Sequence, residues 1–198
     1  MAQGGPRPAE CLELLESAGA HVVLGNSDAF LLDPDASEEP ATERLLEVRE
    51  WSLAQLDSRW VDYMSSFPRT VELELDGLRL LCFHGTPRSY DEVVLPEEPP
   101  DPFDGTGADR LAGGHVHVPQ LRRVGATALY VNPGSVGIGY DHLQPDDDFR
   151  FDPWASYAIL DAQSVGFHRV PFDLDELDAV TRASGIPRSG EVFDLYRR

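Results

Sequence analysis

The chain has 198 residues, of which 41% are hydrophobic, and this is enough for one domain with a sizeable core. Its 35 acidic and 16 Lys or Arg residues give a formal net charge of -19, which disfavours a broad nucleic-acid-binding surface. All of those basic residues are arginines, so the lack of lysine excludes a Walker phosphate loop, a pyridoxal Schiff base and a lysine nucleophile.

Cysteine usage and the N-terminus bear on the compartment. Cys11 and Cys82 are too few for a disulfide framework, and we expect both to be small core residues. The N-terminus lacks the basic segment and apolar run of a secretion signal, and no stretch of the sequence is long enough to cross a bilayer. These features predict a cytoplasmic protein with no membrane contact.

The first part of the chain predicts helices around one short strand. Apolar residues at helical spacing and an opening proline predict a helix over Pro8 to Ala18. His21 to Leu24 is predicted to be a short buried strand, which would place Gly25-Asn26-Ser27-Asp28 at its carboxyl end. A helical pattern then extends from Thr42 to Phe67, with a possible break near Asp57. Its candidate core residues are Leu45, Leu46, Trp51, Leu53, Leu56, Trp60 and Met64.

A hairpin is the firmest local prediction in the next part of the chain. Val71 to Leu75 alternates between apolar and acidic residues, and Asp76-Gly77 is a strong hairpin turn. Leu78 to Phe83 returns as a more apolar strand that delivers His84. The segment from Pro96 to Gly107 is rich in proline and acidic residues, which predicts a solvated loop.

The remaining elements are predicted to be strands and one closing helix. Leu121 to Val131, which turns at Gly125, predicts a second hairpin. Ser156 to Asp161 and Val165 to Val170 predict a third. A helix from Leu174 to Ala183 is expected to close the fold.

The segment His115-Val116-His117 is the strongest local sign of function. Two imidazoles one residue apart offer nitrogen ligands to a metal, and in an extended segment both rings lean to the same side. Asn26 and His84 each follow a predicted strand, where α/β sheets place ligands. These fragments predict one metal site. Neutral imidazoles and an amide oxygen suit manganese, iron, zinc or nickel better than calcium or magnesium.

Each fragment also has a structural interpretation. Asn26 alone is typical of a turn that follows a strand. His84 alone could be a structural histidine at the end of a strand, with its hydrogen bonds satisfied. The histidine pair alone could lie on an exposed strand. The other histidines, His21, His142 and His168, lack partner motifs and are expected to be structural or exposed.

The segment Asn132-Pro133-Gly134-Ser135-Val136-Gly137 predicts a tight, backbone-defined loop after a hairpin strand. Ser135 raises the question of a nucleophile. The segment lacks the GxSxG pattern and a predicted strand-to-helix elbow, so a serine hydrolase is disfavoured.

Taken together and in order, four motifs resemble those of the calcineurin-like metallophosphoesterase family, and most closely its small prokaryotic phosphodiesterases. They are Gly25-Asn26-x-Asp28, His84-Gly85-Thr86-Pro87-Arg88, Gly114-His115-x-His117-x-Pro119-Gln120 and Asn132-Pro133-Gly134-Ser135-Val136-Gly137. The similarity covers Gly5 to about Val170. It implies an α/β fold of the α+β type, a four-layer αββα sandwich, formed by residues 1–198 as a single domain.

The resemblance also implies a reaction and a ligand set. Family members are phosphodiesterases or phosphatases in which two metal ions, bridged by an aspartate and water, activate a hydroxide for in-line attack. Asn26, His84 and His115 match the ligands of one metal, and His117 matches a ligand of the other. Asp28 is expected to orient its neighbours and not to act as a general base. We expect manganese, with iron, zinc or nickel as alternatives, and a small phosphoester as substrate.

The sequence departs from the family pattern at its start. The family's opening Asp-x-His and Gly-Asp motifs are absent, and Gly5-Pro6-Arg7-Pro8 resembles the segment just after them. We therefore expect an N-terminally truncated member that lacks the first one or two strands, through a misplaced start site or genuine loss. Its four neutral ligands are expected to hold at most one ion. The missing strands would leave open sheet edges, which makes a homo-oligomer possible.

A second departure is Ser27, which stands where many family members have a histidine. Serine in place of that histidine would favour substrates with better leaving groups. Two other classes of function stay open. The chain could be a non-catalytic remnant that binds a partner or a single metal. A cupin-type barrel also uses closely spaced histidines, but it explains neither Gly25-Asn26-x-Asp28 nor the helix from Thr42 to Phe67.

Overall fold

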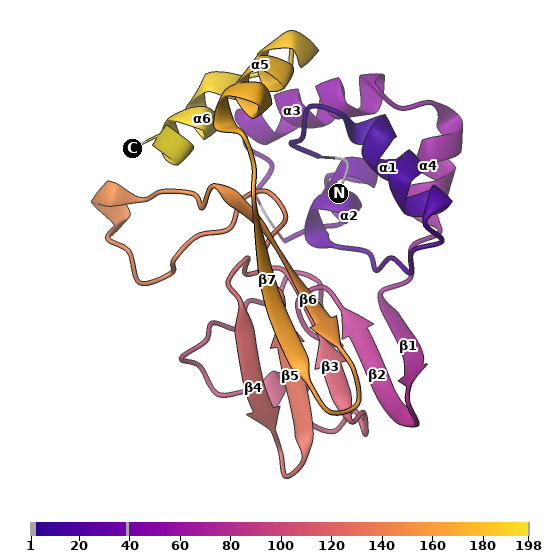
Figure 1. The fold of residues 1–198 in the computed structure, drawn as a ribbon. Coiled ribbons are helices and arrows are strands. Elements are labelled where there is room, and N and C mark those ends of the chain that lie inside the picture. Colours follow the sequence, from indigo (N-terminus) through magenta and orange to yellow (C-terminus); the bar gives the residue numbers. More distant parts are fainter. Residues whose placement is uncertain (1–2, 39, 198) are drawn as a thin grey trace.

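The computed structural model describes residues 3–38 and 40–197, and its helices gather at one end of two β-sheets (Figure 1). Four helices precede the strands: α1 Pro8–Ser17, α2 Asn26–Leu32, α3 Glu43–Ala54 and α4 Ser58–Ser65. Two follow them: α5 Leu174–Ser184 and α6 Ser189–Arg197. The expected α/β fold class is confirmed.

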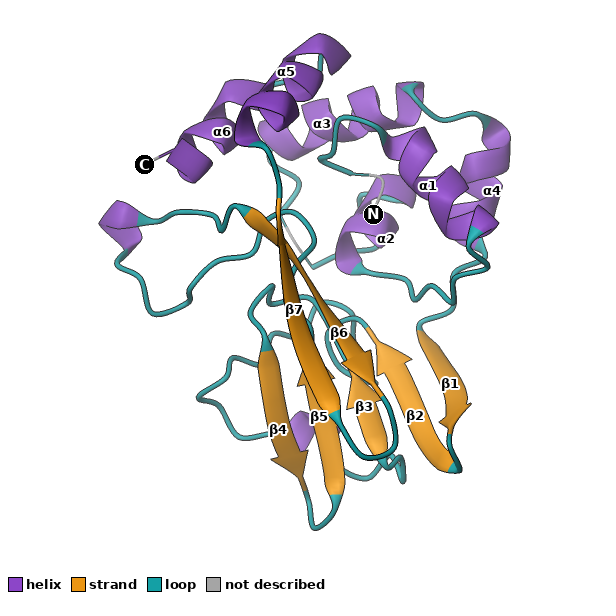
Figure 2. Cartoon of the chain, in the orientation of Figure 1, coloured by secondary structure: helices purple, strands orange, loops and turns teal. Residues whose placement is uncertain are grey.

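The central sheet has five strands in the order β1-β2-β3-β5-β4. They are β1 Thr70–Leu75, β2 Leu78–Phe83, β3 Arg110–Ala112, β4 Gln120–Val124 and β5 Ala128–Asn132. The outer pairs β1–β2 and β4–β5 are antiparallel hairpins, whereas β2, β3 and β5 run parallel. The carboxyl ends of these three parallel strands therefore meet at the helical end of the sheet, which is where α/β sheets place ligands (Figure 2).

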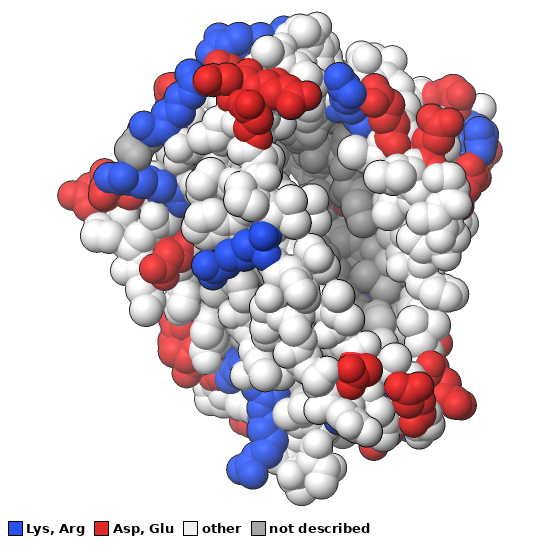
Figure 3. All heavy atoms as spheres, viewed as in Figure 1, with Lys and Arg blue, Asp and Glu red and all other residues white. Residues whose placement is uncertain are grey.

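A second sheet consists of β6 Trp154–Leu160 and β7 Val165–Pro171, and it crosses in front of the first sheet in Figure 1. Its face includes Tyr157, Ile159 and Val170, whose exposed fractions are 43%, 56% and 52%. Much of the surface over this hairpin is uncharged, whereas charged side chains gather over the helices and at the far ends of the strands (Figure 3).

The hairpins and long helices predicted from the sequence are confirmed, and local chemistry explains them. Asp76 and Gly77 adopt positive φ values of 51° and 82°, as a tight hairpin turn requires. The break in the long helical pattern separates α3 from α4. It lies at Asp57, whose carboxylate caps α4 by accepting a hydrogen bond of 3.2 Å from the Trp60 N–H.

The strand predicted over His21 to Leu24 was wrong. The Leu24 N–H donates to the Pro68 carbonyl at 2.8 Å, but residues 21–24 form no strand. Val22 instead joins a core between the N-terminal helices. This helical core consists of Leu12, Val22, Leu31, Trp60, Met64 and Phe67. The next residues form α2, which the sequence had not predicted.

Three further expectations about burial were wrong, and the first is that Leu46 belongs to the core, because this side chain is 36% exposed. The acidic segment from Pro96 to Gly107 is not simply a solvated loop, because Phe103 in its 3-10 turn Asp101–Phe103 is fully buried and stacks on Tyr130 with ring centroids 4.1 Å apart. A second core thereby forms against the central sheet, from Leu81, Phe83, Val94, Phe103, Ala108, Leu111, Val124 and Tyr130. Cys11, which we expected in the core, is exposed because it lies on the outer face of α1.

The lengths and hydropathies of the helices decide whether any of them could span a membrane. Within residues 3–38 and 40–197, none is both long enough and apolar enough to cross a bilayer.

Candidate metal centre

Three of the four predicted ligands meet at the carboxyl end of the central sheet. Asn26 is the first residue of α2, His84 directly follows β2, and His115 lies in the loop after β3. His84 Nε2 is 2.9 Å from Asn26 Oδ1 and 3.3 Å from His115 Nδ1. Donors that share one ion at about 2.0–2.2 Å lie about 3.0–3.5 Å from one another. The spacing within this donor triad, Asn26, His84 and His115, therefore fits a single metal ion.

The position of Asn26 depends on the residues on either side of it. The Gly25 N–H donates to Asp28 Oδ2 at 3.2 Å, which fixes the first turn of α2. A Cβ atom on Gly25 would lie 3.0 Å from the His84 ring. Glycine at this position thus allows the imidazole to approach the backbone, while Asp28 holds the turn that presents Asn26.

His115 is oriented by a backbone carbonyl. Its Nε2 lies 3.1 Å from the carbonyl oxygen of Asp91. Because a carbonyl only accepts hydrogen bonds, Nε2 must carry the ring proton. The lone pair of Nδ1 therefore faces His84 and Asn26, the other two members of the triad. The Gly114 N–H donates to the His84 carbonyl at 2.8 Å and ties the loop of His115 to the end of β2.

The segment of the histidine pair is not extended. His115 and His117 adopt left-handed φ values of 66° and 57°, so the two rings do not share one side of a strand. His117 instead points Nδ1 at the carbonyl oxygen of Ile138, at 3.2 Å. The structure therefore brings three of the predicted ligands together and places the fourth against the loop that follows β5.

Burial keeps the imidazoles of His84 and His117 neutral. Burial, reinforced by neighbouring His115 and opposed by Asp28, lowers the pKa of His84 to about 4. Burial also lowers the pKa of His117, although its hydrogen bond to Ile138 acts in the opposite direction. Both rings therefore keep a lone pair available at neutral pH, which metal binding requires.

Asn132 joins the two loops around these histidines. This residue is fully buried; its Nδ2 donates to the Gly114 carbonyl at 2.6 Å, and its Oδ1 accepts from the Gly134 N–H at 2.9 Å. Gly113, which precedes Gly114 in the sequence, has no room for a side chain, because a Cβ atom there would lie 2.6 Å from Tyr130 Oη. The triad is thus supported by a packed and hydrogen-bonded base.

Sequence reasoning missed the groups that orient the rings. The carbonyls of Asp91 and Ile138 carry no side-chain signal, whereas Asn132 lies in a motif that had been noticed without a role. Ser135 holds the same loop, because its Oγ accepts from the Gly137 and Ile138 N–H groups at 3.4 and 3.2 Å. In residues 3–38 and 40–197 no three His, Cys, Asp or Glu side chains form a metal-binding group. The triad contains two histidines, and its third donor is the amide of Asn26.

Comparisons with known proteins identify the family of the chain. The model for the calcineurin-like phosphoesterase superfamily domain matches residues 4–164. A metallophosphoesterase from Sphaerobacter thermophilus is 26% identical, with a TM-score of 0.73 and coverage of 96% of this chain and 82% of that one. A hypothetical protein from Pyrococcus horikoshii OT3, 19% identical, shares the fold with a TM-score of 0.76 and coverage of 98% and 80%. No curated protein matches the chain. The chain belongs to the calcineurin-like phosphoesterase superfamily, whose members are metal-dependent hydrolases of phosphoester bonds.

Proposed function

We propose that this chain hydrolyses a small phosphoester by means of a divalent transition metal held by Asn26, His84 and His115. The observation that carries the proposal is the convergence of three neutral donor atoms from separate segments, with separations of 2.9 and 3.3 Å around His84 Nε2. Two imidazoles and one amide oxygen suit manganese, iron, zinc or nickel. Manganese is the ion to test first.

The triad residues prepare the site for an anionic substrate. A bound divalent ion supplies polarisation of a phosphoryl oxygen and a lowered pKa of water. Asn26 ligates through an uncharged oxygen, so it leaves more of the ion's positive charge for the phosphoester. His84 and His115 are held in place by α2, the end of β2 and the Asp91 carbonyl, so little ordering is needed on binding.

His117 and Asp28 have different proposed roles. His117 uses Nδ1 for its contact with Ile138, which leaves Nε2 available as a metal ligand. Asp28 is proposed to orient Asn26, since its carboxylate accepts the Gly25 N–H within the first turn of α2. That contact makes it an orienting residue and not a general base.

A second candidate function is metal binding without turnover. It is favoured by the chemistry of the donors, because an amide oxygen and imidazole nitrogens bind a metal without adding negative charge, and no Asp or Glu completes a metal-binding group within the described residues. Two divalent ions near one another need anionic ligands to offset their repulsion. On this alternative the chain holds one ion and acts through a partner.

The test combines calorimetry with manganese-dependent hydrolysis of an aryl phosphodiester. We expect the parent chain to bind manganese and to turn over, His84→Ala to lose both, and His117→Ala to bind one ion but lose turnover at least about tenfold. His168→Ala is the matched control, because His168 is exposed on β7, where it stacks on Tyr157, and it should match the parent.

Each other outcome has a defined meaning. Manganese binding that requires His84 but is accompanied by no hydrolysis would establish the second candidate function. If His84→Ala bound manganese as tightly as the parent, both candidates would fail, because the triad would not be the metal site.

A further inference from the structure

The C-terminal helix α6 contacts the loop that holds His117, although it lies outside residues 4–164, which the family model matches. Tyr196 Oη on α6 donates a hydrogen bond to the carbonyl of Gly137. A second connection is indirect. The Phe151 N–H donates to the Leu195 carbonyl at 2.9 Å, and the Asp152 N–H donates to the Gly139 carbonyl at 2.7 Å. The loop is thus fixed to α6 on both sides of Ile138.

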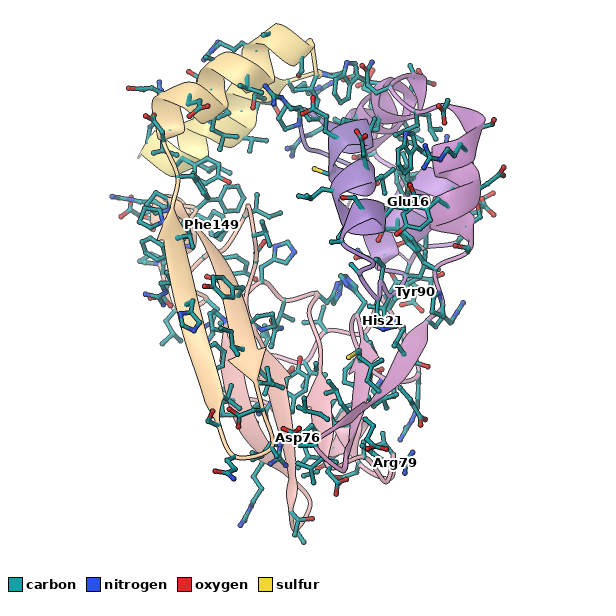
Figure 4. All side chains as sticks on the ribbon, turned by 45° about the vertical axis from the view of Figure 1, so that its right-hand side comes forward. Glu16, His21, Asp76, Arg79, Tyr90 and Phe149 are labelled. Atoms are coloured by element: carbon teal, nitrogen blue, oxygen red, sulfur yellow. The ribbon has the colours of Figure 1, made fainter. Side chains whose placement is uncertain are left out.

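Tyr196 lies in a cluster of aromatic rings that fixes its position. Its ring centroid is 5.4 Å from Phe151, 5.9 Å from Phe172 and 5.8 Å from Phe193. Phe149, seen below the C-terminal helices in Figure 4, extends the cluster, with a centroid 5.4 Å from Phe151. Burial also raises the pKa of Tyr196 to about 12, so its hydroxyl keeps the proton that it donates.

The residue between these two attachments is the one that contacts His117. The Ile138 carbonyl lies 3.2 Å from His117 Nδ1, while the Ile138 N–H donates to Ser135 Oγ at 3.2 Å. A carbonyl only accepts, so this contact requires the proton to be on Nδ1 of His117 and leaves Nε2 with its lone pair. A shift of the Gly137 peptide would move the Ile138 carbonyl with it, because the two residues are adjacent.

We propose that Tyr196 is a positioning residue for His117, and that α6 acts through it to fix the tautomer of that histidine. The described contacts of Tyr196 do not include the triad. It holds the Gly137 carbonyl, which places the Ile138 carbonyl against Nδ1 of His117 and directs the free Nε2 toward metal. The metal-related part of this role rests on the proposed function, but the tautomer does not.

The experiment is nitrogen NMR of the His117 ring in the metal-free protein, at a pH where the ring is neutral. We expect the parent to show one tautomer, protonated at Nδ1. Tyr196→Phe removes only the hydroxyl and keeps the ring in its cluster, and it should yield a mixture with several-fold more of the Nε2-protonated form. Tyr63→Phe is the control, because Tyr63 lies on α4 among Trp60 and Phe67 and should leave the ring unchanged.

A second variant keeps the test decisive if Tyr196→Phe does not fold. Phe193→Leu loosens α6 while retaining the Tyr196 hydroxyl, and it should shift the same tautomer. In the hydrolysis assay, Tyr196→Phe should lower kcat up to about tenfold, as for other changes behind a metal ligand, with KM little changed.

An unchanged His117 tautomer in folded Tyr196→Phe would overturn the positioning role, whatever the activity. A shifted tautomer in a protein whose parent hydrolyses nothing would retain the positioning role and refute the proposed function. The two failures are therefore distinguishable.

Discussion

The two histidines of the segment His115-Val116-His117 lie in differently built halves of the site. His115 is held through Nε2 by the Asp91 carbonyl and offers Nδ1 to the triad, whereas His117 is held through Nδ1 by Ile138 and leaves Nε2 free. In both rings the backbone decides which nitrogen keeps its lone pair. One short motif can therefore present two candidate ligands of opposite tautomer, and the surrounding loops set the difference.

The two halves also differ in what supports them. The triad half stands on the ends of parallel strands, where Asn132 and Tyr130 are fully or almost fully buried beneath it. The His117 half depends on the loop of Ile138 and on its attachment to α6. We therefore expect the triad half to respond to changes in the core, and the His117 half to respond to changes in the C-terminal helix.

The largest effect is expected from filling the space beneath the triad. In Gly113→Ala the new methyl group would lie 2.6 Å from Tyr130 Oη. The Tyr130 ring stacks against Phe103, so it cannot move away without disturbing the core. The free energy of unfolding should fall by about 3 kcal/mol, at the upper end for overpacking. Urea unfolding measures the loss. Gly137→Ala is the control, because nothing lies within 4 Å of its added Cβ. Equal stability of the two variants would contradict the packed base.

Alkaline pH should destabilise the packed residues beneath the triad, because Tyr130 is one of them. Burial raises the pKa of Tyr130 to about 12, compared with about 10 in an unfolded chain. The folded state thus keeps a proton that the unfolded chain loses, so this contribution is complete below pH about 10 and is lost as the pH rises toward about 12. We expect a loss of between about 2 and 3 kcal/mol.

Urea unfolding at several alkaline pH values tests this loss. Tyr130→Phe should remove its part of the pH dependence, whereas Tyr157→Phe, on the exposed face of β6, should keep it. The same slope in Tyr130→Phe and in the parent would disprove the contribution of Tyr130.

A smaller effect is expected from adding charge to the triad. Asn26→Asp keeps the shape of the side chain and places a carboxylate 2.9 Å from His84 Nε2. Manganese should bind about tenfold more tightly, because the added charge attracts the ion directly. Calorimetry compares this variant with Ser27→Asp, which adds the same charge one residue away from the triad. Equal gains in both variants would show that net charge, and not ligation by residue 26, controls affinity.

The smallest effect concerns the first turn of α2. Asp28→Ala removes the acceptor of the Gly25 N–H, and Asp173→Ala removes the cap of α5, which accepts from the Asp175 and Glu176 N–H groups. Each should cost about 1 kcal/mol of stability in thermal unfolding. Only Asp28→Ala should also weaken manganese binding, several-fold, because only α2 presents Asn26. Equal manganese affinity in both variants would remove the orienting role of Asp28.

Much of the fold was predictable where local chemistry decides conformation. The turn at Asp76-Gly77 and the cap at Asp57 are set by residues next to one another, so β1, β2 and the boundary between α3 and α4 followed from the sequence. The short helix α2 was not predictable, since its seven residues fall below the length over which helical periodicity is informative. Its start is fixed instead by the contact between Gly25 and Asp28.

The sequence by itself determined the kinds of donor at the site, because an asparagine and three histidines in family-like motifs have recognisable spacing. The tertiary structure alone decided which of them meet. The parallel order of β2, β3 and β5 brings His84, His115 and Asn132 to one edge, and the carbonyls of Asp91 and Ile138 contact the rings of His115 and His117. The carbonyls that fix the two tautomers belong to residues distant in sequence. Every residue has such a carbonyl, so only the folded arrangement could select these two.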